Sequence, residues 1–389
     1  MGGLGLALGG GGARGVYQLG VWRAFRELDL HFDAIAGTSA GAINAALMVG
    51  TDYERAVDMW ENLQVEQLLD ISQDQDLRSA NLVSPKNVDI LAKELFTQGS
   101  FNTAPLRSLL GKYLSEEAIR SSSVRYGLMT ALLPELTPQP LWIDQIGSGQ
   151  LIDYIIASAH YPGLQPVKIG DRRFIDGGLR ENVPVSMLYK MGLRRIIAVD
   201  LRLRPCVRGP LYDNTQLTYI HDKQSLGGVM DLTPAVLKRN QQLGYLDTMK
   251  ALDQLNGEFY AFKPADHHKL VSQYGMDNLS GLEQAALVYE MDRCIVYTAD
   301  AFIEQISRRR NEVQNVYLQK RQALQIDNKL LAVLNGQLKI LKLLPPLKLA
   351  FLMELMAFAQ QSGYATKLPM QMFNNMDAAA RALRMIPTD

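Results

Sequence analysis

The sequence predicts an α/β fold built on a mostly parallel sheet, followed by a helical extension at the C-terminal end. Leu4 to Leu8 and Phe32 to Ala36 are apolar runs of strand length, and each leads into a glycine-containing turn followed by a helical pattern. Strand, turn and helix, occurring twice near the start of the chain, are typical of a parallel sheet covered by helices. From about Leu282 onward the pattern is long and helical, interrupted at Pro345-Pro346, which predicts the extension.

Further apolar runs predict the rest of the sheet and its helices. Strands are expected at residues 124–132, 141–143, 173–175, 195–201 and 259–262. Helices are expected at residues 42–49, over much of 53–120, at 152–159 and at 185–191. Residues 203–232 contain several prolines and glycines and are interpreted as a loop or lid.

Composition excludes several classes of protein. The 389 residues include 40 basic and 40 acidic side chains, so the formal net charge is zero, without the basic excess of a nucleic-acid binder. The first residues lack the basic region of a secretory signal, and no run approaches the ~18 apolar residues of a membrane-spanning helix. Two cysteines make neither a disulfide framework nor a metal site. We therefore expect a cytoplasmic protein that binds no nucleic acid and contacts membranes at most peripherally.

A serine between two glycines follows the second predicted strand. Gly37-Thr38-Ser39-Ala40-Gly41 fits the G-x-S-x-G nucleophile elbow, in which the serine occupies a strained turn between a strand and a helix. Its exposed hydroxyl then lies near a helix N-terminus, where the helix dipole stabilises negative charge. The five residues alone also fit a tight turn with a capping serine. The apolar strand before them and the small-residue helix after them favour a nucleophile.

A glycine-rich stretch, Gly10-Gly11-Gly12-Ala13-Arg14-Gly15, follows the first predicted strand. Consecutive glycines expose backbone N–H groups, which at the start of a helix can converge on an anion such as the oxyanion of an acyl-transfer intermediate. The stretch also fits the G-x-G-x-x-G dinucleotide fingerprint, which predicts an acidic residue closing the second strand. Ser39 follows that strand instead, so the two loops together favour an oxyanion hole beside a nucleophile. Arg14 either fixes the loop or contacts a substrate phosphate.

A carboxylate follows a predicted strand far downstream. Asp176-Gly177-Gly178 comes directly after residues 173–175, so the Asp176 side chain can point to the sheet edge that carries Ser39. The two glycines would let this loop pass closely. Asp-Gly is also a common turn dipeptide, so a turn capped by its own aspartate is the alternative.

The order of these three motifs resembles that of the patatin-like phospholipases, which carry G-G-G-x-R/K-G, G-x-S-x-G and D-G-G/A. Ala157-Ser158, followed by Pro162 and Pro166, also looks like a stretch of that family. The motifs lie within about residues 4–201. The resemblance implies a patatin-like three-layer sandwich with a mostly parallel central sheet. It places the catalytic domain at residues 1–268 and leaves a helical C-terminal extension at residues 276–389.

The resemblance also implies a lipid acyl hydrolase that works through a Ser–Asp dyad. Ser39 would be the nucleophile, Asp176 the base, and the amides around Gly11 and Gly12 the oxyanion hole. No metal or organic cofactor would be required. The substrates would be phospholipids or acylglycerols, cleaved at a carboxylic ester through an acyl-Ser39 intermediate. Because a carboxylate is ordinarily a weaker base than histidine, burial beside apolar lipid would have to raise its basicity.

Other functions and mechanisms remain open. His221, His267 and His268 follow Asp176 and allow a Ser–Asp–His triad, although the early position of the elbow favours the dyad. A catalytically silent lipid-binding or regulatory protein on the same fold is another possibility, and a nucleotide-binding protein that uses Gly10 to Gly15 is a third. Residues 338–358, rich in leucine and methionine with lysines between them, fit either a membrane-surface helix or helices packed on the catalytic domain.

Overall fold

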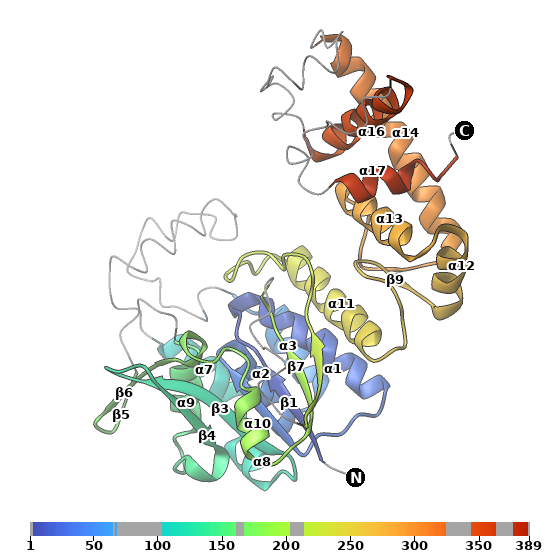
Figure 1. The fold of residues 1–389 in the computed structure, drawn as a ribbon. Helices are drawn as coiled ribbons and strands as arrows, with labels where there is room; N and C mark the ends of the chain where they lie inside the picture. Colours follow the sequence, from blue (N-terminus) through green and yellow to red (C-terminus); the bar gives the residue numbers. More distant parts are fainter. Residues whose placement is uncertain are drawn as a thin grey trace. The chain divides into compact units, whose positions relative to one another are not determined.

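The computed structural model describes residues 3–64, 67, 103–160, 167–202, 214–323, 344–362 and 376–387. The chain forms two compact units, Met1–Leu252 and Asp253–Asp389 (Figure 1). The boundary expected from the sequence, between residues 268 and 276, lies inside the second unit, because the strand and helix at residues 261–274 pair and pack with later elements of that unit. Pro162, Pro166 and residues 338–343 lie outside the described residues.

The first unit is built on a sheet of mostly parallel strands. Its described strands are β1 (Leu4–Leu8), β2 (Ala34–Thr38), β3 (Arg125–Leu132), β4 (Thr137–Trp142), β5 (Val167–Ile169), β6 (Arg172–Asp176), β7 (Arg195–Val199) and β8 (Gln216–Ile220). They follow the order β5-β6-β3-β2-β1-β7-β8, with β4 paired to β3. The strands from β3 to β8 in this order run parallel, whereas β4, β5 and β6 pair antiparallel. The predicted α/β class is confirmed.

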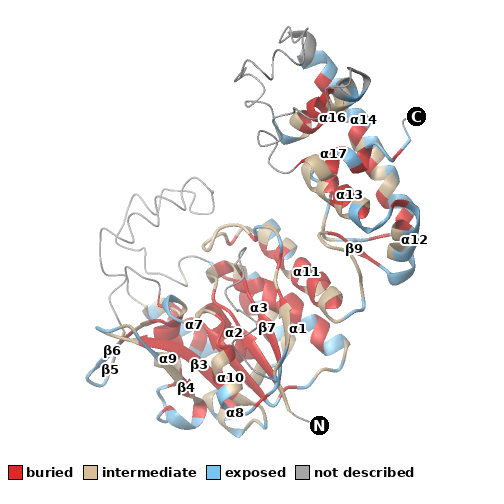
Figure 2. Cartoon of the chain, viewed as in Figure 1, coloured by how far each residue is buried: buried red, intermediate tan, exposed pale blue. Residues whose placement is uncertain are grey.

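Helices cover both faces of this sheet. They are η1 (Gly12–Val16), α1 (Tyr17–Glu27), α2 (Ala40–Gly50), α3 (Tyr53–Glu61), α7 (Ala104–Tyr113), α8 (Glu116–Ser121), η2 (Ile143–Gln145), α9 (Leu151–Ser158), η3 (Gly177–Leu179), α10 (Val185–Lys190) and α11 (Pro234–Ala251). α10 packs on the face that carries Ala7, Ala36 and Ala198, with α1 and α2 on the other side (Figure 1). Cover on both faces buries the central strands almost completely, as Figure 2 shows.

Strand β8 corrects one expectation from the sequence. The sequence predicts a loop or lid over residues 203–232, but Gln216–Ile220 pairs with β7 and extends the parallel sheet. Leu217 and Tyr219 alternate along β8 and pack against the core beneath α10. The loop interpretation is therefore wrong for this segment, whose alternation is obscured in the sequence by the prolines and glycines around it.

Helices α1 and α11 approach each other backbone to backbone. A Cβ atom at Gly20 would lie 1.8 Å from the carbonyl oxygen of Gln241, and one at Gly244 would lie 2.0 Å from that of Tyr17. Glycine is therefore required at both positions. Because α1 begins directly after the glycine-rich stretch, α11 supports the part of the chain that carries that loop.

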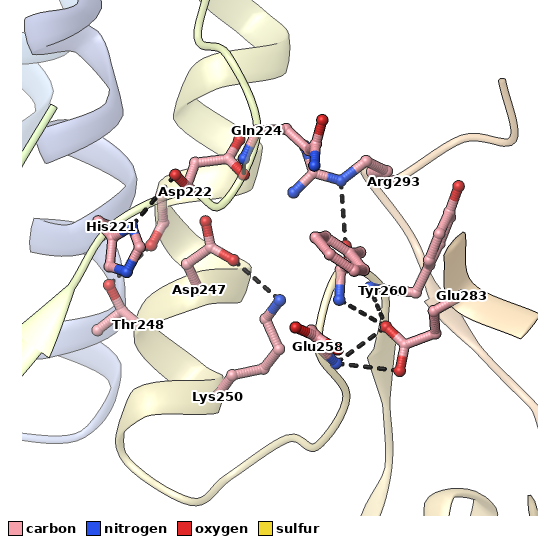
Figure 3. A network of polar contacts seen from close by, with 12 residues as sticks. His221, Asp222, Gln224, Asp247, Thr248, Lys250, Glu258, Tyr260, Glu283 and Arg293 are labelled. Carbon is pink, nitrogen blue, oxygen red and sulfur yellow. Dashed lines mark hydrogen bonds and ion pairs between the residues drawn. The ribbon is translucent and has the colours of Figure 1, made fainter. Parts of the chain in front are cut away.

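The second unit is mainly helical and has its own core. Its described elements are β9 (Ala261–Phe262), α12 (Pro264–Tyr274), α13 (Met276–Val288), β10 (Val296–Tyr297), α14 (Ala299–Ala323), α16 (Pro345–Ser362) and α17 (Asp377–Leu383). The buried Glu283 carboxylate accepts backbone N–H bonds of 2.5 to 3.0 Å from Glu258, Phe259 and Tyr260 (Figure 3). These bonds fasten the chain before β9 to α13.

The leucine-rich C-terminal segment packs inside this second core. α16 begins at Pro345, and its Leu349, Phe351, Leu352 and Leu355 are fully buried among residues of the same unit. For the described part, residues 345–362, a packed helix is found as expected, but its core partners belong to the second unit and not to the domain that carries the three motifs. Among the helices of the described ranges, none is both long enough and apolar enough to cross a membrane.

Candidate active site

Ser39 occupies a strained bend between β2 and α2. Its backbone φ is 56° and its ψ is −127°, a conformation that costs a non-glycine residue about 1–3 kcal/mol. Two glycines make the bend possible. A Cβ atom at Gly37 would lie 2.1 Å from the carbonyl oxygen of Gly41, and one at Gly41 would lie 2.2 Å from that of Leu8. Thr38 ends the strand and Ala40 starts the helix, in the order that the sequence predicts.

The sheet register brings Asp176 to the level of Ser39. Thr38 of β2 pairs with Met129 of β3, and Asp176 of β6 pairs with Thr130, the next residue of β3. Ser39 and Asp176 therefore lie at one level on either side of β3. Both side chains line one cavity, and the Ser39 hydroxyl is close enough to the Asp176 carboxylate to lower its pKa.

The surroundings of Asp176 favour its protonated form more than water does. Its side chain is nearly buried, and this burial raises its pKa to about 6, while hydrogen bonds from the Gly178 N–H (2.7 Å) and from Ser39 oppose the rise. Gly177 passes so close to β3 that a Cβ atom there would lie 2.3 Å from the Met129 carbonyl oxygen. Asp-Gly-Gly thus places the carboxylate in a buried position beside the sheet. A larger residue at position 177 would push this loop away from β3.

The glycine-rich loop lies directly against the serine. A Cβ atom at Gly10 would lie 2.7 Å from the Ser39 Cβ atom, so only glycine allows this approach. Asn182 holds Gly10 in place, because the Gly10 N–H donates to the Asn182 carbonyl (3.2 Å) and the Asn182 side chain donates to the Gly10 carbonyl (3.1 Å).

Two amides of this loop remain available to a ligand. The Ala13 N–H donates to the Val229 carbonyl at 2.7 Å, and the Arg14 N–H donates to the Gly11 carbonyl at 3.3 Å. The N–H groups of Gly11 and Gly12, in contrast, donate to no other residue that the structure describes. Gly12 has a φ of 59°, and a Cβ atom there would lie 2.2 Å from the Val229 carbonyl oxygen. The loop therefore presents unused donors beside Ser39.

Arg14 anchors the loop from the other side. Its Nε donates to the Gly227 carbonyl at 2.7 Å, and burial lowers the pKa of its guanidinium group. This contact supports the first of the two roles expected from the sequence, fixing the loop. Gly15, the last residue of the stretch, lies within η1, where a Cβ atom would meet the Trp60 ring at 2.7 Å.

A cavity of about 360 Å³ adjoins Ser39, Asp176 and residues 10–14. Its walls are mainly apolar and come from several helices. They include Ile43, Met59, Trp60, Leu106, Leu109 and Leu110. A cavity of this kind fits a hydrocarbon chain with its polar end at the serine. Arg202 also lines it, held at 2.8 Å by the buried Asp200 carboxylate, and neither residue stood out in the sequence.

Ser158 supports the elbow in a way that the sequence did not indicate. Its buried hydroxyl accepts a hydrogen bond from the Ser39 N–H (2.9 Å) and donates one to the Met129 carbonyl (2.7 Å), which ties the bend to β3. The only signal for Ser158 was its place in the stretch that resembles the patatin family. Asn182 had no signal, because a lone asparagine in a loop has many common roles.

The histidines that would complete a triad are not among the residues that line the cavity in the described part of the chain. His221 follows β8 and packs against Tyr219, and His267 and His268 belong to α12 of the second unit. His160 does line the cavity, and its carbonyl accepts the Asp176 N–H at 3.2 Å.

No group of three metal-binding side chains occurs among the described residues.

Residues 6–189 match the family model described as patatin-like phospholipase. This stretch is a patatin-like phospholipase domain. It contains the glycine-rich loop, the elbow and the Asp-Gly-Gly loop, whereas β7, β8 and α11 lie beyond the match.

Relatives of the patatin-like domain occur in much longer proteins. The chain is 25% identical over 269 residues to lysophospholipase NTE1 of Mycosarcoma maydis, covering 68% of this chain and 13% of that one. It is 28% identical over 206 residues to a patatin-like phospholipase domain-containing protein of Caenorhabditis elegans, covering 51% and 13%. The crystal structure of VipD from Legionella pneumophila aligns with a TM-score of 0.42 and 16% identity, covering 100% of this chain and 92% of that one. The chain thus spans about an eighth of the length of these two curated relatives.

Proposed function

We propose that this chain hydrolyses carboxylic esters of phospholipids or acylglycerols through an acyl-Ser39 intermediate. The observation that carries the proposal is the placement of Ser39 and Asp176 together in the wall of one cavity, where burial raises the pKa of the Asp176 carboxylate to about 6. Two unused loop amides and an apolar cavity adjoin this pair. The family match and the lipase names of its relatives support a lipid ester as the substrate.

In the first half of the proposed reaction, Ser39 Oγ attacks the ester carbonyl carbon while Asp176 takes the hydroxyl proton. The negative charge that develops on the carbonyl oxygen is stabilised by the N–H groups of Gly11 and Gly12. The bond from carbon to the alcohol oxygen then breaks. The lysolipid or other alcohol leaves with the proton from Asp176, and the acyl group stays on Ser39.

In the second half, a water molecule replaces the alcohol. Asp176 takes a proton from this water as its oxygen attacks the acyl carbon, and the same amides stabilise the second oxyanion. The bond to Ser39 Oγ breaks, the fatty acid leaves, and the proton returns to the serine. Asp176 serves both halves because each begins with a proton moving onto a carboxylate and ends with that proton leaving it.

The first prediction concerns pH. Asp176 accepts a proton only when it is ionised, and its pKa is raised to about 6. We therefore expect kcat/KM to fall on the acidic side with an apparent pKa near 6, as the carboxylate becomes protonated, and to level off above it. The measurement is kcat/KM for a soluble p-nitrophenyl ester from about pH 4.5 to about pH 8. An acidic limb near the ordinary aspartate value of about 4 would contradict this assignment.

The second prediction tests the reaction itself. The protein should release free fatty acid from phosphatidylcholine vesicles or triacylglycerol emulsions, and EDTA should leave the rate unchanged because no step uses a metal. The measurement is mass spectrometry of released fatty acid and lysolipid. An EDTA-sensitive rate would require a different mechanism, and the relative rates on the two lipids identify the preferred substrate.

Labelling separates this enzyme from a silent lipid-binding protein on the same fold. A fluorophosphonate reacts with an activated serine, so a lipid hydrolase should gain one label, located at Ser39 by peptide mass spectrometry. A protein that only binds lipid should bind lipid vesicles but should not be labelled by the fluorophosphonate. A nucleotide-binding protein would instead bind labelled NAD or ATP and lose that binding on Gly12 substitution.

A further inference from the structure

Three buried side chains behind the glycine-rich loop form one continuous hydrogen-bonded network. They are Gln18 of α1, Asn44 of α2 and Trp60 of α3, and we call them the amide brace. Gln18 and Asn44 are each 1% exposed and Trp60 is 3% exposed. Buried amides are costly unless they are hydrogen-bonded, so the partners of these groups define what the brace does.

The brace holds both ends of the loop. Gln18 Nε2 donates to the Gly9 carbonyl at 2.8 Å, directly before the loop. Asn44 Nδ2 donates to the Gly15 carbonyl at 2.9 Å, at its end, and also to Gln18 Oε1 at 2.8 Å. Both N–H bonds of the Asn44 amide are thus used, and its Oδ1 accepts the Trp60 indole N–H at 2.8 Å.

The brace also reaches the cavity. The Trp60 ring is part of the cavity wall, and it packs so closely on Gly15 that a Cβ atom there would meet the ring at 2.7 Å. The loop amides of Gly11 and Gly12 lie between the two braced carbonyls. The Gly9 carbonyl shares a planar peptide unit with the N–H of Gly10, directly before Gly11, so fixing this carbonyl and the Gly15 carbonyl limits how far the backbone between them can shift.

We infer that Gln18, Asn44 and Trp60 are positioning residues, which orient the N–H groups of Gly11 and Gly12 toward the oxyanion. Through the Trp60 ring they also link this orientation to the wall of the acyl cavity. This inference rests on the proposed function, because it assigns those amides to an oxyanion. None of the three side chains needs to contact the reacting atoms. Their effect comes from geometry, since a shift of about 1 Å in a catalytic group can cost about 10²-fold in rate.

The test is Gln18→Met, which keeps the length of the side chain and removes its hydrogen bonds. We expect kcat to fall about 10- to 100-fold while KM changes less than about threefold, because the oxyanion forms only after the substrate is bound. Inhibition by a long-chain alkyl trifluoromethyl ketone, which forms a tetrahedral oxyanion on the serine, should weaken by a similar factor. An unchanged kcat, or a rise in KM alone, would overturn the inference.

Tyr17→Phe is the matched control. Tyr17 precedes Gln18 on the same helix, is fully buried and donates to Asp247 at 2.8 Å, so its loss also removes a buried hydrogen bond. Asp247 keeps its ion pair with Lys250 at 2.9 Å (Figure 3). This variant should lose thermal stability and keep kcat and the ketone inhibition. Equal losses of kcat in Tyr17→Phe and Gln18→Met would mean that the brace only stabilises the fold.

A second variant keeps the inference testable if Gln18→Met does not fold. Trp60→Phe removes the indole N–H while leaving an aromatic ring in the wall, and we expect kcat and ketone inhibition to fall together by about 3- to 10-fold. A parallel fall in kcat and in ketone inhibition supports the brace, whereas a rise in KM alone would assign Trp60 to substrate binding only. If the wild-type protein hydrolyses no ester, the proposed function and the brace fail together. If the wild type is active and both variants match it, only the brace fails.

Discussion

Ser39→Ala should lower the rate of lipid-ester hydrolysis by at least about 10³-fold, equivalent to about 4 kcal/mol of transition-state stabilisation. The substitution removes the atom that forms the acyl bond in the proposed reaction, while Ala40 can still start α2 and the glycine loop keeps its contacts. The fold should remain intact, because an alanine at this bend loses the hydroxyl and keeps the same backbone. The measurements are the initial rate of hydrolysis of lipid vesicles and the extent of fluorophosphonate labelling. The variant should show neither hydrolysis above the expected residual rate nor labelling.

Ser280→Ala provides a matched control for this experiment. It also removes one hydroxyl with a carboxylate partner, Glu258 at 2.8 Å, but it lies in the second unit. Its rate and labelling should match those of the wild type. If Ser39→Ala kept substantial hydrolysis with its circular dichroism unchanged, another nucleophile would have to carry the reaction.

Asp176→Asn should lower kcat by about 10³-fold or more while leaving the structure in place. Asparagine has the same shape, and its oxygen can still accept the Gly178 N–H that Asp176 accepts at 2.7 Å. It cannot take a proton from Ser39, so the serine loses its base. The measurement is kcat on a soluble ester, with His221→Ala as the comparison. A comparably large loss in the folded histidine variant would replace the dyad by a triad.

The same variant should be more stable than the wild type at neutral pH. Folding raises the pKa of Asp176 to about 6 from an ordinary value near 4, so the folded protein binds this proton more tightly than the unfolded chain. The resulting stability is present below about pH 4 and is lost as the pH rises through about 6, at a cost of about 3 kcal/mol. Asparagine stays neutral at all these pH values. The Tm of the Asp176→Asn variant should therefore exceed that of the wild type at pH 7, and the difference should shrink toward pH 4. A lower Tm at pH 7 would contradict this account.

The main features of the fold were predictable because local patterns encode them. The two opening strand–turn–helix repeats gave the parallel sheet, since apolar period and glycine turns are properties of adjacent residues. β8 was missed because its short alternating pattern, Gln216–Ile220, is surrounded by turn-forming residues. The division after Leu252 was also missed, because it depends on pairing between Ala261 and Val296, which are distant in sequence.

The geometry of the candidate site was predictable where it depends on glycine. Gly10, Gly37 and Gly177 each mark a close backbone approach, and such runs of glycine are conspicuous in a sequence. Gln18 and Asn44 were not predictable, because a helical amide side chain is usually exposed, and only the packing of α1 against α2 and α3 buries these two. The raised pKa of Asp176 likewise depends on burial, which no single motif reports.

The contacts of Gly37 and Gly41 have a consequence for how this protein can diversify. Where β1, β2 and α2 meet, carbonyl oxygens face α-carbons with no side chain between them, so the spacing there is set by atomic radii alone. Substitution cannot widen or narrow that spacing by small steps. Leu106 and Leu109 on α7, in contrast, can change size one methylene at a time. Under the proposed function, selectivity for acyl length can therefore change at the cavity walls while the backbone spacing around Ser39 stays the same.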